Sequence, residues 1–178
     1  AGKTQPAAAH LSNTFENRVA RKTYLAIVTG SLPDKDAGII KATIARVTVH
    51  GREQIVADHP DASAAKSAQT DWRVFARGDS AALVELKPRT GRMHQIRVHL
   101  SHIGCPILGD PIYGTGKESA ERLMLHASAL SIPHPDETEL ALSAPLPADM
   151  QAMLDQHGLA MPRPEDQFLR AELRNPTT

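Results

Sequence analysis

The stretch Lys87-Pro-Arg-Thr-Gly-Arg-Met-His-Gln-Ile-Arg-Val-His-Leu-Ser-His-Ile-Gly104 combines a basic turn with a short helix. It contains four Lys or Arg residues and three His residues, but no Asp or Glu. The whole chain is balanced, with 20 Lys and Arg against 20 Asp and Glu, so this positive charge is a local concentration. A basic turn that leads into a helix is suited to hold a phosphate-rich or carboxylate partner.

Composition restricts the class of protein. A chain of 178 residues fits one domain with a sizeable core, and 41% apolar with 22% charged residues is ordinary for a soluble protein. With zero net charge, any nucleic-acid binding must come from a patch. The single cysteine, Cys105, excludes an internal disulfide and a cysteine-built zinc site, and fits a reducing compartment. No apolar run approaches the roughly 18 residues of a membrane helix, and no signal peptide is recognisable.

Strands predominate among the elements that the sequence predicts. Apolar periodicity predicts helices over residues 6–17, 93–103, 147–157 and, weakly, 165–173. Strands are predicted over residues 22–29, 38–50, 69–76, 81–86, 123–132 and 139–142, with residues 51–52 starting a short excursion and residues 59–68 forming a loop. The strands come in hairpin-like runs, which predicts an α+β fold with a mostly antiparallel mixed sheet and flanking helices. Residues 1–178 are expected to form a single domain.

Two residues stand out by their position in these elements. Strand 22–29 is apolar on both faces and is therefore expected at the centre of the sheet. Tyr24 lies in that strand, where a buried hydroxyl would need a partner, although its position by itself favours an ordinary core tyrosine. In the helix over 93–103, an apolar stripe runs along one side and Arg97 lies at its edge. The stripe consists of Met93, Ile96, Leu100 and Ile103.

Arg97 is expected to be partly buried, and a buried charge needs a partner. A structural salt bridge would satisfy it. A catalytic carboxylate or a phosphate would satisfy it equally well. Helical position alone leaves these possibilities open.

Other chemistries find little support. His94, His99 and His102 are five and three residues apart, so only the last two could share a metal, and no HExxH motif occurs. No metal site is predicted. Residues 114–117 lack the full phosphate-loop spacing, and no serine stands in GxSxG, although an unrelated hydrolase using His and Ser stays an alternative. Aromatic residues make up 3% of the chain, which argues against a base-stacking platform.

Four motifs in the chain resemble those of the RluA-like pseudouridine synthases, the ribosomal large subunit type. They are RKTYLAIVTG at residues 21–30, TGRMHQIRVHL at 90–100, PILGDPIYG at 106–114 and LMLHASAL at 123–130. Four motifs in the family's order are far more specific than any one of them. They cover roughly residues 18–135.

The resemblance implies a pseudouridine synthase-like fold and the isomerisation of uridine to pseudouridine in RNA, without metal or cofactor. The target base is extruded into the site, as enzymes that act on a base in paired RNA require. The expected partner is structured RNA, ribosomal RNA in particular, and no membrane. A cytoplasmic protein that is monomeric when complete is expected.

The same resemblance assigns roles to individual residues. Tyr24 matches the tyrosine that packs on the target base and assists proton removal, and Arg97 matches the basic residue that pairs with the catalytic aspartate. Leu125 and Ile96 are expected to contact the substrate base. The residues expected to face RNA are Lys87, Arg89, Arg92 and His94.

One motif of the family is absent. Its catalytic aspartate stands in H-R-L-D-x-x-T-S-G before the first helix, and none of the 11 aspartates here has that context; Asp110 stands in the family's structural G-D-P segment. The chain is therefore expected to be the C-terminal major part of a catalytic domain, inactive alone and with open sheet edges. Arg97 should meet solvent, a bound anion or a substitute acid. A non-catalytic RNA-binding module derived from such an enzyme is the alternative.

Overall fold

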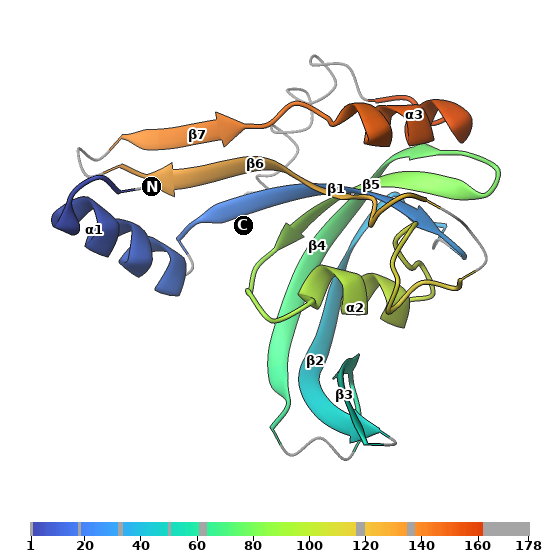
Figure 1. Ribbon diagram of the computed structural model, residues 1–178, viewed down its shortest axis with the longest axis horizontal. Coiled ribbons are helices and arrows are strands. Elements are labelled where there is room, and N and C mark those ends of the chain that lie inside the picture. The colour runs from blue at the N-terminus through green and yellow to red at the C-terminus, as the bar shows by residue number, and fades with distance from the viewer. Residues whose placement is uncertain are drawn as a thin grey trace, which may run out of the picture.

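A seven-stranded sheet with three helices around it makes up the fold in the computed structural model (Figure 1). The structure describes residues 2–17, 19–31, 34–49, 51–60, 64–116, 120–134 and 138–161, so the helix predicted over 165–173 lies outside the described residues. The helices are α1 (Gln5–Glu16), α2 (Gln95–His102) and α3 (Ala148–Gln156). The strands are β1 (Arg21–Thr29), β2 (Ala37–Val49), β3 (Arg52–Ala57), β4 (Lys66–Arg77), β5 (Ala81–Pro88), β6 (Leu125–Pro133) and β7 (Glu139–Ser143).

The strand order in the sheet is β3-β2-β4-β5-β1-β6-β7, and each pair of neighbours is antiparallel. The pairs β2-β3, β4-β5 and β6-β7 are hairpins of consecutive strands. β1 instead pairs with β5 and β6, which are distant from it in the sequence. The predicted α+β class with a mostly antiparallel sheet is confirmed.

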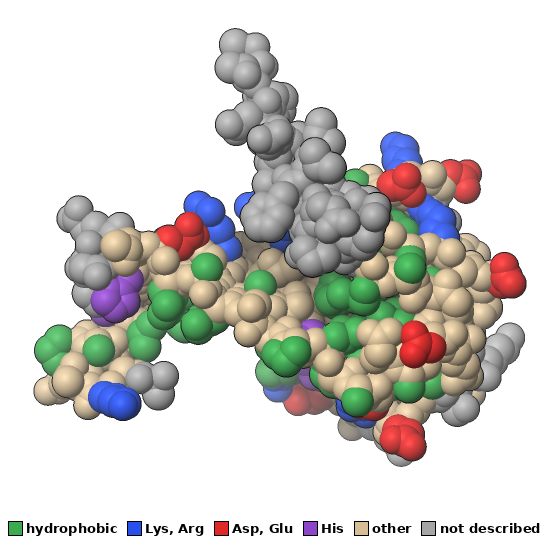
Figure 2. All heavy atoms as spheres, turned by 90° about the horizontal axis from the view of Figure 1, so that it is seen from above, with side chains coloured by type: hydrophobic (Ala, Val, Ile, Leu, Met, Phe, Trp, Pro, Cys, Tyr) green, Lys and Arg blue, Asp and Glu red, His purple; other side chains and the backbone are tan. Residues whose placement is uncertain are grey.

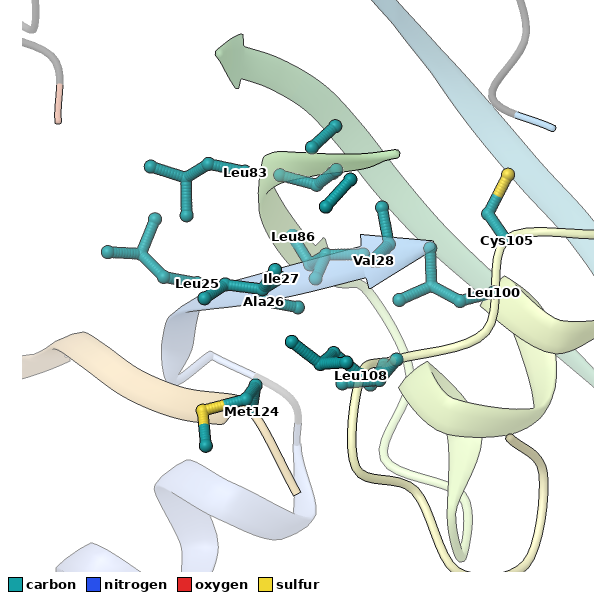
Figure 3. Close-up of a cluster of buried hydrophobic side chains, with 14 of the residues drawn as sticks. Leu25, Ala26, Ile27, Val28, Leu83, Leu86, Leu100, Cys105, Leu108 and Met124 are labelled. Atoms are coloured by element: carbon teal, nitrogen blue, oxygen red, sulfur yellow. The ribbon is translucent and has the colours of Figure 1, made fainter. Parts of the chain in front are cut away.

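β1 lies at the centre of the core. Its second half is buried on both faces, because Leu25 and Ile27 point to one side while Ala26 and Val28 point to the other. In Figure 3 these side chains meet those of β5, α2 and the segment that precedes β6. The central position predicted for this strand is therefore confirmed.

The β4-β5 hairpin requires glycine at its turn. The amide of Gly78 donates to the carbonyl of Ala81 at 2.9 Å, which closes the turn. A Cβ atom on residue 78 would lie 2.5 Å from the backbone oxygen of His157, just after α3. The absence of a side chain therefore lets the end of α3 approach the hairpin, and α3 buries Met150 and Leu154 in the core.

Three expectations about element boundaries were wrong. Residues 52–57 form the edge strand β3, and β4 begins at Lys66, inside the predicted loop. α2 begins at Gln95 rather than at residue 93, because His94 adopts a left-handed conformation with φ of 53°. Met93 consequently lies outside the helix and is 55% exposed, so it does not belong to the apolar stripe.

The outer strands of the sheet are β3 and β7. Every residue of β7 is exposed, including Leu140 and Leu142. Viewed from this edge, hydrophobic side chains gather along the surface over β7 and around α3 (Figure 2). Among the helices that the structure describes, none has the length and apolar character needed to cross a membrane.

Candidate functional site

Tyr24 and α2 lie on the same face of the sheet. Tyr24 is opposite Leu86 in β5, and Leu86 is opposite Trp72 in β4, so these three side chains share one face. Thr70 is two residues from Trp72 and shares that face, and its hydroxyl is hydrogen-bonded to the ring of His99 in α2 at 3.0 Å. The fold thus brings β1 and α2, which carry the two predicted catalytic residues, to one side of the sheet.

The two residues predicted to contact the substrate base have different surroundings. Leu125 lies opposite Ala26, so it shares the face of Tyr24 and is its diagonal neighbour across β1 and β6. Its side chain is partly buried against the core. Ile96, at the start of α2, is itself a buried core residue.

Arg97 forms a two-pronged ion pair with Asp110. Its Nε donates to Oδ2 at 2.8 Å and its Nη2 donates to Oδ1 at 2.6 Å. The side chain of Arg97 is 14% exposed and that of Asp110 is fully buried. The expectation that Arg97 is partly buried is confirmed. Its partner is Asp110, an acid of this chain that was expected to be structural and not to replace the catalytic aspartate.

Asp110 is held in its ionised form. Burial would by itself raise the pKa of its carboxyl, but hydrogen bonds from Arg97 and from the amides of Tyr113 and Ile112 outweigh burial and lower that pKa. The same hydrogen bond from Arg97 raises the pKa of the guanidinium. The pair therefore carries one positive and one negative charge at neutral pH.

Tyr113 completes the surroundings of Arg97. Its ring lies 5.0 Å from the guanidinium carbon, and its hydroxyl is hydrogen-bonded to Nδ1 of His94 at 2.9 Å. Burial raises the pKa of this hydroxyl, which keeps it neutral. The sequence places Asp110 and Tyr113 in the motif PILGDPIYG, which was expected to be structural, and neither residue was predicted to belong to the site. The signal that could have identified them is the partly buried Arg97, which required an acid nearby.

The basic turn before α2 is fastened by Gln95, which is buried. Its carbonyl oxygen accepts from the hydroxyl of Thr90 at 2.7 Å and from the amide of Arg92 at 3.0 Å. Its amide group donates to the backbone oxygen of Gln69 at 2.9 Å and to Thr70 at 3.1 Å. Gln95 thus ties the turn that carries Arg89 and Arg92 to β4.

The residues predicted to face RNA do not form one free cluster. Lys87 follows Leu86 and so points to the face opposite Tyr24, where it contacts Glu85 at 3.1 Å. Arg89 is paired with Asp71 at 2.6 Å.

Arg92 and His94 are further along the turn. The Nε of Arg92 donates to the backbone oxygen of Ser67 at 3.5 Å, and His94 is bonded to Tyr113. Lys87 and Arg89 also line a groove of about 390 Å³, together with Arg21 and Lys22 of β1.

The histidines of α2 have partners in the sheet. His99 is fully buried against Thr70, and Nε2 of His102 lies 3.6 Å from Asp58 Oδ2. Within the described ranges, no three His, Cys, Asp or Glu side chains come together as metal ligands would.

Burial of His99 predicts an acid-sensitive stability. Burial and the nearby His102 lower the pKa of His99 below its ordinary 6.5, while the backbone of Ala42 and Asp58 act in the opposite direction. The unfolded chain therefore takes up the proton first, so stability is full above about pH 6.5 and falls as the pH drops below it. Urea unfolding at pH 8 and pH 5 should show this loss, and His99→Gln should reduce it. The exposed His134→Gln is the control, and an equal loss in the His99 variant would contradict the assignment.

Comparison with known proteins identifies the family. A family model described as RNA pseudouridylate synthase matches residues 1–102. The chain is 40% identical over 136 residues to the dual-specificity RNA pseudouridine synthase RluA of Yersinia pestis, covering 75% of this chain and 64% of that protein. It is 36% identical over 162 residues to the ribosomal large subunit pseudouridine synthase D of Nitrosomonas europaea, covering 85% of this chain and 45% of that protein. The chain spans about half the length of the curated relatives it matches.

The solved structures agree with the predicted fold. Human RNA pseudouridylate synthase domain containing 1 superposes with a TM-score of 0.80 at 29% identity, over 99% of this chain and 75% of that chain. The pseudouridine synthase-like fold is therefore confirmed. Since the family model matches 102 of the 178 residues, the chain belongs to the RNA pseudouridylate synthase family.

Proposed function

We propose that the protein to which this chain belongs isomerises uridine to pseudouridine in ribosomal RNA, as a cytoplasmic monomer without metal or cofactor. In this reaction the bond from the sugar to N1 of uracil breaks, the base turns and a bond from the sugar to C5 forms. The proton on C5 leaves and N1 takes up a proton, so the product is an isomer of uridine. The proposal rests on one observation: Tyr24 and helix α2, which carries Arg97, lie on the same face of the sheet. Tyr24 would pack on the extruded base and assist proton removal, with Leu125 and Ile96 beside the base.

The catalytic carboxylate is proposed not to be Asp110. That side chain is buried, and it already accepts hydrogen bonds from Arg97, Ile112 and Tyr113. A carboxylate that reacts with a nucleoside must be reachable by it. Since none of the other aspartates stands in the family's catalytic motif either, we infer that these 178 residues alone do not catalyse the reaction.

The test uses the full reading frame that encodes this chain and a ribosomal RNA transcript labelled with tritium at C5 of uridine. Formation of pseudouridine releases the label into water, so tritium release directly measures removal of the proton from C5. The full protein should release tritium and residues 1–178 alone should not. RNA binding by the full protein without tritium release would instead support the non-catalytic module.

The basic turn predicts a specific salt dependence of RNA binding. Arg92 has no carboxylate partner among the described residues, whereas Arg89 is held by Asp71. In a plot of log association constant against log salt concentration, Arg92→Gln should reduce the slope by about one. Asp71→Asn should release Arg89 and tighten binding. Fluorescence anisotropy with the exposed Lys35→Gln as control measures both, and an unchanged slope for Arg92→Gln would remove it from the interface.

A further inference from the structure

The guanidinium of Arg97 is occupied along one edge. That edge consists of Nε and Nη2, which donate to the two carboxylate oxygens of Asp110 at 2.8 Å and 2.6 Å. Such parallel pairing fixes both the position and the plane of a guanidinium, which a single contact does not. Asp110 therefore determines how Arg97 is oriented.

Asp110 can fix Arg97 because it is itself fixed. Its Oδ1 also accepts from the amide of Ile112 at 2.9 Å and from that of Tyr113 at 3.0 Å. The amide of Gly114 donates to its backbone oxygen at 3.1 Å, which closes the turn. The carboxylate is thus held by the backbone of its own turn and has no freedom to follow a moving arginine.

The same turn supports Arg97 from a second side. Tyr113 presents its ring to the guanidinium, and its backbone oxygen accepts from the hydroxyl of Ser101 at 3.2 Å. Its hydroxyl reaches His94 immediately before α2. Tyr113 therefore joins turn 110–114 to α2 through two contacts, one at its hydroxyl and one at its backbone oxygen.

The remaining edge of the guanidinium is open. Nη1 of Arg97 has no hydrogen-bond partner among the described residues. It is not one of the fully buried side-chain nitrogens that lack a partner. This nitrogen is therefore not fully buried, whereas Nε and Nη2 are engaged by Asp110. An arginine held in this way offers a directed donor to one further oxygen.

We propose that Asp110 is a positioning residue of the site. It orients Arg97 so that the open Nη1 donates to the oxygen of a carboxylate taking part in the reaction, and it balances the charge of the guanidinium while doing so. This inference rests on the proposed function, in which Arg97 acts in catalysis. Asp110 touches neither substrate nor reacting atoms, and it acts only through Arg97.

Asp110→Asn in the full protein tests the role. Asparagine keeps an oxygen for the two backbone amides, but it presents an NH₂ group to Arg97 and removes the negative charge. The turnover number should fall about 100-fold, because a misplaced donor no longer stabilises charge in the transition state. The KM for the tritiated ribosomal RNA should change by less than about threefold, since the side chain of Asp110 is fully buried and presents no surface to RNA.

Asp149→Asn is the matched control. Asp149 forms the same kind of two-pronged pair with Arg122, far from Tyr24 in the sequence and at the start of α3. It should leave both kinetic constants unchanged. A loss of turnover shared equally by both variants, or a rise in KM alone, would overturn the positioning role.

Three further outcomes also test the positioning role of Asp110. If Asp110→Asn does not fold at the assay temperature, Asp110→Ser keeps an acceptor for the turn, and failure of both to fold assigns Asp110 to folding and rejects the proposal. Full turnover in a folded Asp110 variant rejects it as well. If the unsubstituted protein releases no tritium, the proposed function itself fails, which is a separate result from an active protein that tolerates Asp110→Asn.

Discussion

Tyr24→Phe is expected to slow tritium release by the full protein by at least about 100-fold while RNA binding is retained. The substitution removes one oxygen from a residue proposed to assist proton removal from C5. General acid–base groups contribute about 10²–10⁴-fold to turnover, so the turnover number should fall by that factor. The KM should change little, because the ring that packs on the base is still present.

The position of Tyr24 makes this a clean experiment. Its backbone is fixed between Leu86 of β5 and Ala127 of β6, and phenylalanine has the same ring and a good propensity for strands. The fold should therefore be unaffected, which thermal unfolding can verify. A turnover number within tenfold of the unsubstituted protein would contradict a role for the hydroxyl and support an ordinary core tyrosine.

The chain offers a matched control in Tyr113, the second of its two tyrosines. Tyr113→Phe also removes one hydroxyl, and it keeps the ring against Arg97. It gives up the hydrogen bond to His94. Its effect on turnover should be about tenfold or less, which would separate loss of a catalytic proton carrier from loss of a supporting contact.

The centre of the fold was predictable because local sequence determines it. A strand such as β1, apolar on both faces, can be buried only with strands on either side, and the structure places it between β5 and β6. The helical period of Ile96 and Leu100 likewise required an apolar neighbour on one side of α2, and both residues are buried.

Elements that depend on distant partners were missed. β3 has only Ile55 and Val56 as strand-favouring residues and pairs only with β2, so its own composition gives a weak strand signal. α2 does not include the first turn expected for it, because the backbone of His94 is left-handed. The ring of His94 is hydrogen-bonded to Tyr113 in this conformation. Tertiary contacts decided both outcomes.

The candidate site shows the same division. The resemblance of four motifs supplied Tyr24 and Arg97, and the helical position of Arg97 predicted its partial burial, which the structure confirms. That burial indicated that Arg97 needs an acid partner, but it did not identify Asp110, because the pairing depends on where turn 110–114 lies against α2. The opposite directions of Lys87 and Tyr24 follow from strand register, which fixes every side chain of β5 at once.

Arg97→Met is expected to harm both stability and turnover, and a second substitution should separate the two. The single change leaves Asp110 as a buried carboxylate without its charged partner. Breaking a buried pair in this way costs about 3–5 kcal/mol of unfolding free energy. The turnover number should also fall about 10²–10³-fold through loss of the donor aimed at the site.

The double variant Arg97→Met with Asp110→Asn removes both charges. Because asparagine still accepts from the two backbone amides of the turn, most of the lost stability should return. Turnover should not return, since no donor remains for the reacting carboxylate. Urea unfolding of residues 1–178 and tritium release by the full protein measure the two quantities independently.

The corresponding changes at Arg122 and Asp149 calibrate the result. That pair is more open, with both side chains 38% exposed, so Arg122→Met should cost much less unfolding free energy than Arg97→Met. If Arg97→Met costs no more than Arg122→Met, the charge of Asp110 is not effectively buried. If the double variant at Arg97 and Asp110 regains turnover together with stability, then Arg97 only supports the fold, and the site must use another group to hold its carboxylate.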